Sequence, residues 1–191
     1  MKLAIFGGTF DPVHCAHLTA AREAADSFGV DRILFIPAGN PPHKSETSTP
    51  FEDRFRMVQL ACAVDARFEV SPLEAGSDKS YSILTIERIR SSLQPEDRLF
   101  FIIGADAFAE ITFWYRWEDV VRAVEFIVVT RPGHVYDVPE GARVHRLDTL
   151  ALPVSSSDVR RELAAGKRPP ELPETVFDYI RQHGLYRENG C

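Results

Sequence analysis

The sequence is poor in cysteine, has no excess of positive charge and contains no long hydrophobic run, and each absence excludes a class of protein. The three cysteines, Cys15, Cys62 and Cys191, form no C-x-x-C pair, which indicates a reducing compartment rather than a disulfide framework. No apolar run approaches the roughly 18 residues of a membrane span, and an apolar strand pattern stands where a signal peptide would be. We therefore expect a cytoplasmic protein that does not contact a membrane.

The formal net charge of −6 argues against nucleic acid as a partner, because duplex DNA attracts basic surfaces. Phosphate groups must then be met by a local pocket. The length of 191 residues and the hydrophobic content of 45% suit one domain, residues 1–191, with a proper core. A homo-oligomer is compatible with this composition.

Two common phosphate-binding motifs are also absent, G-x-G-x-x-G and G-x-x-x-x-G-K-[ST]. Instead, the chain opens with a short apolar run, residues 3–6, which meets Gly7 and Gly8, and a helical pattern begins near His14. This pattern predicts a strand, a tight turn and a helix. Glycines let a ligand approach the backbone, and the amides at a helix start attract anions, so a phosphate site is predicted here.

Two histidines stand three residues apart at the start of this predicted helix. The spacing places His14 and His17 on one helix face, beside the glycines. Other interpretations stay open: a half-buried structural pair, or a zinc site with His43 as the third ligand. Cys15, between the histidines, raises the further alternative of a thiol nucleophile. The Gly-Gly turn directly upstream favours the phosphate site.

Apolar runs and helical patterns alternate along the whole chain. Strands are expected at residues 3–6, 32–37, 67–71, 98–103, 125–130 and 143–147. Helices are expected at residues 16–28, 50–64, 81–93, 105–111, 117–124, 156–165 and 173–183, with caps at Thr49, Ser80 and either Ser155 or Ser156. This alternation predicts an α/β fold with a doubly wound, largely parallel, Rossmann-like sheet. Ligands should bind at the carboxyl ends of its strands, near residues 7–14, 38–44, 104–106 and 154–160.

Several motifs, in a fixed order along the chain, resemble one enzyme superfamily. Residues 7–17 read GGTFDPVHCAH and residues 154–160 read VSSSDVR. Both are similar to the H-x-G-H and S-S-T-x-x-R motifs of the nucleotidyltransferase superfamily. Within it, the chain resembles the bacterial nicotinate-nucleotide adenylyltransferases through PHK at 42–44, SYS at 80–82, GAD at 104–106, WYRW at 114–117, RPG at 131–133 and YIRQHGLY at 179–186.

Three positions depart from the pattern of this family. Ala16 stands where the pattern has glycine, and its methyl group adds bulk where an ATP phosphate would approach the helix. Ser82 replaces the usual threonine and keeps the hydroxyl. Leu84 stands where aspartate is common, and nothing in the sequence explains that change.

The resemblance implies a reaction in which the phosphate of nicotinate mononucleotide attacks the α-phosphorus of ATP, giving nicotinate adenine dinucleotide and pyrophosphate. The nucleophile is already anionic at neutral pH, so no side chain has to remove a proton. Catalysis then depends on positioning and on stabilising the charge of the transition state. Mg²⁺ is expected as the cofactor, held mainly by the phosphates of ATP, which explains the lack of a carboxylate cluster in the sequence.

The chemistry of the residues fits this reaction. We expect catalysis from two hydrogen-bond donors and two permanent cations: His14, His17, Lys44 and Arg160. The predicted ATP site consists of Gly7, Gly8, Thr9, Phe10, His14, His17, Gly104, Asp106, Ser156, Ser157 and Arg160. The predicted mononucleotide site consists of Lys44, Ser82, Thr85, Trp114 and Tyr115. The resemblance assigns Asp106 to the ATP ribose and Trp114 to the pyridine ring.

Each assignment has a structural alternative. Tryptophans at 114 and 117 fit a hydrophobic core, Lys44 fits a solvated loop, and Asp106 and the serines at 155–157 fit helix caps. Three other functions also stay open: the same reaction with nicotinamide mononucleotide, transfer to another acceptor such as phosphopantetheine, and a non-catalytic nucleotide-binding regulator. The WYRW segment argues against phosphopantetheine, and the presence of all four predicted catalytic residues argues against the regulator.

Overall fold

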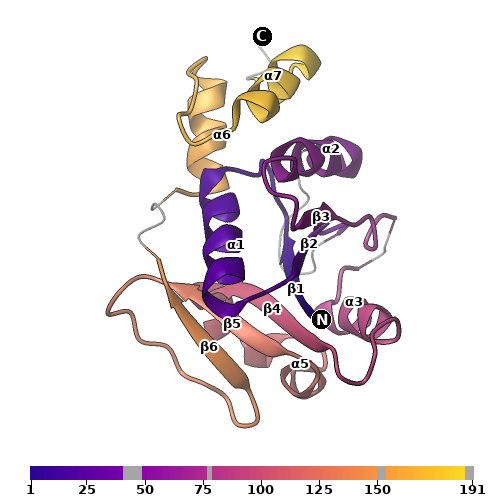
Figure 1. Cartoon of the computed structure of the whole chain (residues 1–191). Coiled ribbons are helices and arrows are strands. Elements are labelled where there is room, and N and C mark those ends of the chain that lie inside the picture. The colour runs from indigo at the N-terminus through magenta and orange to yellow at the C-terminus, as the bar shows by residue number, and fades with distance from the viewer. Residues whose placement is uncertain (41–48, 77–78, 150–153, 188–191) are drawn as a thin grey trace.

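The protein folds around a six-stranded parallel sheet in the order β3-β2-β1-β4-β5-β6 (Figure 1). The computed structural model describes residues 1–40, 49–76, 79–149 and 154–187. The strands are β1 (Lys2–Gly8), β2 (Arg32–Pro37), β3 (Phe68–Val70), β4 (Arg98–Gly104), β5 (Glu125–Thr130) and β6 (Arg143–Asp148). The chain moves outward from β1 to β3 and then returns to β4 on the other side of β1. The doubly wound, parallel α/β fold that the sequence predicts is therefore confirmed.

Helices connect most successive strands, as is usual in a parallel sheet, but the described connection from β5 to β6 is a loop without a helix. The helices are α1 (Cys15–Phe28), α2 (Phe51–Cys62), α3 (Ser82–Arg90), α4 (Ala105–Ala109), the 3₁₀ turn η1 (Ile111–Phe113), α5 (Trp117–Ala123), α6 (Ser156–Ala164) and α7 (Glu174–His183). None of the helices within the described residues combines the length and the apolar character required to cross a membrane.

Different helices cover the two faces of the sheet. Along β1, Ala4 and Phe6 belong to the core that α1, α2, α6 and α7 cover. The neighbouring residues Leu3 and Ile5 belong to the core on the other face, which α3, α4 and α5 cover. Successive strand residues point to opposite faces, so a strand that is apolar throughout contributes to both cores.

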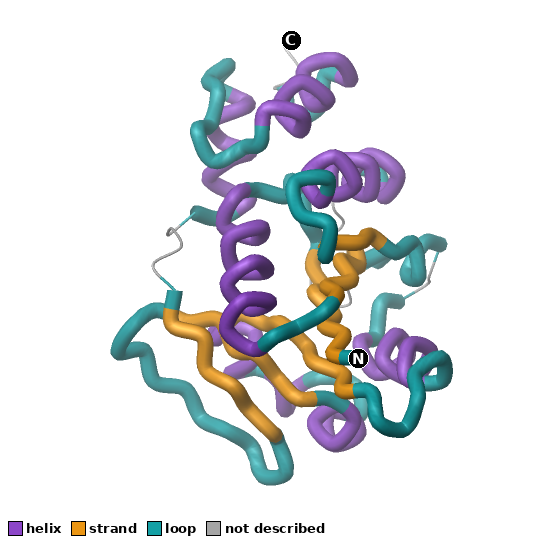
Figure 2. Tube along the Cα trace, in the orientation of Figure 1, coloured by secondary structure: helices purple, strands orange, loops and turns teal. Residues whose placement is uncertain are grey.

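The last two helices lie beyond the first turn of α1 (Figure 2). The backbone N–H of Cys15, the first residue of α1, donates to the carbonyl of Glu171 in the α6–α7 connection, with 2.8 Å between N and O. Helix α7 also packs against α2. The end of the described chain therefore lies against the same end of the sheet as the loop that follows β1.

Two predicted helix caps are wrong. Tyr81 rather than Ser80 is the N-cap of α3, because the Ser80 hydroxyl instead accepts hydrogen bonds from the N–H groups of Gly39 and Asn40 at 2.9 and 3.1 Å. Pro50 rather than Thr49 is the N-cap of α2. The cap at Ser155 is confirmed: its hydroxyl accepts from the Asp158 N–H at 3.2 Å, and Asp158 completes a capping box.

Candidate active site

The loop after β1, residues 9–13, is held by side chains from distant parts of the chain. From α6, Arg160 Nη1 donates to the carbonyl of Asp11 at 2.7 Å, and Ser156 Oγ donates to the carbonyl of Pro12 at 3.0 Å. Beyond α7, the Tyr186 hydroxyl donates to Asp11 Oδ1 at 2.5 Å. Burial raises the pKa of Tyr186 above its usual range, so this hydroxyl stays a donor at neutral pH. We call residues 9–13 the β1 loop.

Glycine at position 8 leaves room for Phe10. A Cβ atom on Gly8 would lie 3.0 Å from the Phe10 ring, which folds back beneath the strand. The Phe10 ring contacts Phe6 and His17 edge-on, at centroid distances of 5.7 and 5.1 Å. The Phe10 side chain is therefore part of the core, and only its backbone can serve a ligand. The glycines also extend β1 to Gly8, two residues beyond the predicted end of this strand.

The two histidines lie against one another at the start of α1, with 3.9 Å between the ring centroids. His17 Nδ1 accepts a hydrogen bond from the His14 N–H at 3.2 Å, so the neutral ring of His17 carries its proton on Nε2. Only 4% of His14 is exposed, and its buried Nδ1 has no hydrogen-bond partner within the described residues. Burial lowers the pKa of His14 to about 4, so this ring is neutral at pH 7.

One part of the predicted phosphate site differs in the structure. The amide of Cys15 donates to Glu171, so the first amide of α1 is not available to an anion. Burial raises the pKa of the Cys15 thiol, which keeps it protonated and weakens the alternative of a thiol nucleophile. Across the described ranges, no three His, Cys, Asp or Glu side chains group closely enough to hold a metal ion. His43, the proposed third zinc ligand, lies outside the described residues.

The start of α6 faces the β1 loop. Ser155 is its N-cap, so Ser156 and Ser157 occupy the first turn, where backbone amides lack partners within the helix. Arg160, one turn later, donates through Nη2 to the hydroxyl of Ser157 at 3.2 Å while its Nη1 holds Asp11. The structure thus brings the predicted residues of α6 together with the β1 loop. Because the cap and the first amides belong to different residues, the Ser155 cap does not use the amides of Ser156 and Ser157.

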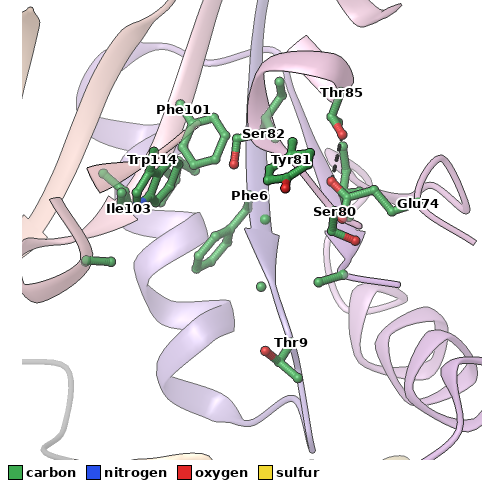
Figure 3. A pocket seen from close by; sticks show the side chains of 18 of the residues that line it. Phe6, Thr9, Glu74, Ser80, Tyr81, Ser82, Thr85, Phe101, Ile103 and Trp114 are labelled. Carbon is green, nitrogen blue, oxygen red and sulfur yellow. Dashed lines mark hydrogen bonds between the residues drawn. The ribbon is translucent and has the colours of Figure 1, made fainter. Parts of the chain in front are cut away.

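A cavity of about 320 Å³ opens beside Gly7 and Gly8, where β1 and β4 part (Figure 3). This is the point where the strand order reverses, the usual ligand position in such sheets. Its walls are mostly apolar and come from both strands, α3, α4 and the segment after η1, and they include Gly104, Ser82, Thr85, Trp114 and Tyr115. Every predicted mononucleotide residue that the structure describes therefore lines one cavity, and Lys44 lies outside the described residues.

Trp114 is half-buried rather than a full core residue. One side of its ring packs edge-on against Phe101, with 6.1 Å between centroids, and the cavity borders the rest (Figure 3). Tyr115 lies farther out, and its ring contacts that of Tyr81 at 4.6 Å. The arrangement offers aromatic surfaces to a flat ring in the cavity.

The polar wall of the cavity contains two carboxylates, Glu74 and Glu110. The Thr85 hydroxyl donates its proton to Glu74 Oε1 at 2.7 Å (Figure 3). A hydroxyl has one proton, so Thr85 presents lone pairs to any ligand in this state. Glu74 was not predicted from the sequence, because an acidic residue in a polar loop does not indicate which distant side chain, here Thr85, it will contact.

Asp106 is the second residue of α4 and is exposed, and the N-cap of that helix is Gly104, two residues earlier. The alternative that Asp106 is the N-cap is therefore wrong. Asp106 does not line the cavity but lies beside its rim, two residues from Gly104 and one from Ala107, which both do.

Comparisons with known proteins agree with this geometry. The cytidylyltransferase-like family model matches residues 5–162. A protein of Solibacter usitatus, described as a probable nicotinate-nucleotide adenylyltransferase, is 60% identical over 187 residues, which cover 97% of this chain and 100% of that protein. This chain belongs to the nicotinate-nucleotide adenylyltransferase family. The resemblance noted in the sequence is thereby confirmed, and so is the expectation of an enzyme of the transferase class.

Other members of the nicotinate-nucleotide adenylyltransferase family show the same full-length match. One from Exiguobacterium sibiricum is 40% identical and covers 97% of this chain and 99% of its own length. Among solved structures, the nicotinic acid mononucleotide adenylyltransferase of Plasmodium falciparum complexed with NaAD superposes with a TM-score of 0.79. It covers 97% of both chains at 21% identity, so this likeness concerns the fold.

Proposed function

We propose that the protein transfers the adenylyl group of ATP to nicotinate mononucleotide, a step of NAD biosynthesis that forms nicotinate adenine dinucleotide and pyrophosphate. One observation carries this proposal: two different half-sites meet at residues 7–9. On one side lies the β1 loop with its paired histidines and the start of α6. On the other lies an apolar cavity with aromatic walls. A triphosphate suits the first half-site and a pyridine nucleotide suits the second.

The ATP half of the site consists of donors that differ in character. His14 is neutral at pH 7, His17 can donate from Nε2, and the first amides of α6 add partial positive charge. Arg160 is a permanent cation beside the β1 loop, and its guanidinium can donate to a phosphate oxygen while it also donates to the Asp11 carbonyl. The buried Nδ1 of His14, without a partner among the described residues, is a group that a bound phosphate would satisfy.

The acceptor half of the site is the cavity. Trp114 stacks on the pyridine ring, and the first turn of α3, beginning at Ser82, supplies amides for the ring substituent. Gly7 and Gly8 let the phosphate of the mononucleotide pass close to the backbone toward the β1 loop. Asp106, at the cavity rim, is positioned for a ribose hydroxyl.

The reaction needs no proton transfer. An oxygen of the mononucleotide phosphate bonds to the α-phosphorus of ATP, and the bond from that phosphorus to the bridging oxygen of pyrophosphate breaks. The electron pair leaves with pyrophosphate, whose added charge the donors of the β1 loop and α6 stabilise. The protein contributes by holding two anions in line, which is where most of the acceleration in such reactions arises.

Mg²⁺ fits this site only as an ion carried by the nucleotide. Asp11 is the carboxylate nearest the histidines in sequence, and it is engaged by Tyr186. Together with the lack of a metal-holding cluster in the described ranges, this argues for a cation coordinated mainly by phosphate oxygens. Such an ion would neutralise phosphate charge as the two substrates approach.

The test is a pyrophosphate-release assay with ATP and each of two acceptors, nicotinate mononucleotide and nicotinamide mononucleotide. We expect release with the acid. The amide is a second candidate because Thr85, which donates to Glu74, presents an acceptor that suits an amide N–H. Release with the amide alone would replace the proposed acceptor, and release with neither would overturn adenylyl transfer to pyridine nucleotides.

A further inference from the structure

Arg54 is a buried cation that the sequence motifs do not include. It is the fourth residue of α2, and only 1% of the residue is exposed. Its guanidinium donates to three carbonyls: Nη1 to Thr9 at 2.7 Å, Nε to Thr49 at 3.1 Å and Nη2 to Gly39 at 3.5 Å. The three acceptors belong to the β1 loop, to the segment before α2 and to the segment after β2. One side chain therefore joins three separate backbones.

The environment of Arg54 is unusual for a purely structural residue. Among the described residues, no carboxylate forms an ion pair with its guanidinium, although Asp11 lies near enough to favour the charge. Burial lowers the pKa of Arg54, yet an arginine stays charged at neutral pH. Burying a cation against neutral carbonyls costs free energy that an apolar side chain of similar volume would not.

The first contact of Arg54 fixes the phosphate-binding side of the site. The carbonyl of Thr9 and the N–H of Phe10 belong to one planar trans peptide, so they point in opposite directions. Because Arg54 holds the Thr9 carbonyl, the Phe10 N–H points away from Arg54 and from the interior that surrounds it.

The contact of Arg54 with the Gly39 carbonyl fixes the side of the site that would bind the acceptor, nicotinate mononucleotide. Gly39 is locked in place, because a Cβ there would lie 2.0 Å from the Glu74 carbonyl and because its N–H donates to Ser80. Ser80 and Glu74 both line the cavity. Arg54 thus connects the β1 loop directly to the wall of the acceptor cavity without reaching into either half-site.

We propose that Arg54 is a positioning residue that sets the distance between the two half-sites. The inference rests on the proposed function, because only a reaction between two bound substrates requires a fixed distance between the two half-sites. Arg54 touches neither substrate. Its loss leaves each half-site able to bind its own ligand, but the two phosphates no longer meet in line, and a misplacement near 1 Å lowers turnover about a hundredfold.

The experiment compares Arg54→Met and Arg54→Lys with a matched control, Arg56→Met, whose side chain is exposed on the same helix. We expect kcat at saturating ATP and nicotinate mononucleotide to fall about a hundredfold in Arg54→Met. The Kd of each ligand alone, measured by calorimetry, changes less than about threefold, and Arg56→Met resembles the wild type. Arg54→Lys keeps the charge but cannot bridge three carbonyls, so its kcat falls about tenfold.

A merely structural role gives a different result. Ligands that bind the folded state restore a destabilised variant, so saturating substrates would then return kcat to the wild-type value and overturn the proposal. If Arg54→Met does not fold, the same measurement is made on Arg54→Lys: a lowered kcat at saturating substrates supports the proposal, and a wild-type kcat overturns it.

Amide hydrogen exchange provides a readout that does not depend on turnover. Residues 9–13 and 38–40 should both lose protection in the Arg54 variants while β5 does not. Unchanged exchange in either segment would contradict the proposal. Failure of the wild type to release pyrophosphate would overturn the proposed function, and the exchange result would still decide the role of Arg54.

Discussion

Buried polar and charged groups have different partners at the two ends of the sheet. At the amino end, Glu125 accepts two hydrogen bonds from Arg98, at 3.0 and 2.6 Å, and contacts His145 Nε2 at 2.8 Å. The hydrogen bonds from Arg98 are the main reason that the pKa of Glu125 is lowered to about 2. At the carboxyl end, Arg54 has only neutral carbonyls as hydrogen-bond acceptors, and His14 Nδ1 has no partner among the described residues.

This difference in partners indicates that the groups at the amino end contribute to stability and those at the carboxyl end to ligand binding. A charge whose partners are all in the protein stabilises the fold but has nothing left to offer a ligand. A buried polar atom that the protein leaves without a partner, such as His14 Nδ1, costs stability, and an anionic ligand recovers that free energy when it binds. We therefore expect substitutions at the carboxyl end to change catalysis more than stability, and those at the amino end to do the reverse.

The largest expected effect is that of His17→Ala. Removing a donor aimed at developing charge should lower kcat about a thousandfold, because such donors act mainly in the transition state. Circular dichroism and the melting temperature should stay near those of the wild type, since the ring is partly exposed. Near wild-type turnover at saturating ATP would contradict a phosphate role for this histidine.

The buried His14 should make the stability of the unliganded protein depend on pH. Its pKa is about 4 when folded and 6.5 when unfolded, so the unfolded chain binds the extra proton as the pH falls between these values. We expect the wild type to lose about 3 kcal/mol of unfolding free energy from pH 6.5 to pH 4 that His14→Gln does not lose. Urea unfolding at several pH values measures this difference, and parallel curves would show that His14 is not desolvated.

At the opposite end of the sheet, Glu125→Gln should lower the free energy of unfolding by about 1–2 kcal/mol at pH 7. The lowered pKa of Glu125 means that its contribution is present above about pH 4.5 and is lost as the pH falls toward 2. The kcat should not change, because Glu125 begins β5 at the end remote from the cavity. A loss of kcat with unchanged stability would remove the contrast between the two ends.

The smallest expected effect is that of Trp114→Ala. Loss of one aromatic wall should raise the KM for nicotinate mononucleotide about tenfold while the KM for ATP changes less than about twofold. Steady-state kinetics with each substrate varied in turn measures the two constants. An equal rise in both would assign Trp114 to packing against Phe101 instead.

The fold was predictable from the sequence because its signals are local. The apolar runs of β1, β4 and β5 are too short for buried helices and alternate with helical patterns, which leaves few architectures open. The errors concern helix starts, where tertiary contacts compete with local capping. The hydroxyl of Ser80, for example, serves Gly39 and Asn40 rather than its own helix.

The candidate site was only partly predictable. Motif residues such as His14 and Ser156 are recognisable by type and spacing, whereas Arg54 and Tyr186 act on residues that lie 45 and 175 positions away in the chain. Arg54 did leave a signal, since it shares a helix face with the buried Met57, Val58 and Ala61 at helical spacing. A charged residue within an apolar helix face is a reason to look for a buried role.

The hydrogen bond between Tyr186 and Asp11 also has a consequence for how the protein is made. Tyr186 leaves the ribosome 175 residues after Asp11, so the β1 loop obtains this support only long after its own synthesis. Every strand of the sheet is complete by residue 148. A nascent chain that stops after α6 therefore contains the whole sheet and both histidines but lacks the tyrosine that holds their loop.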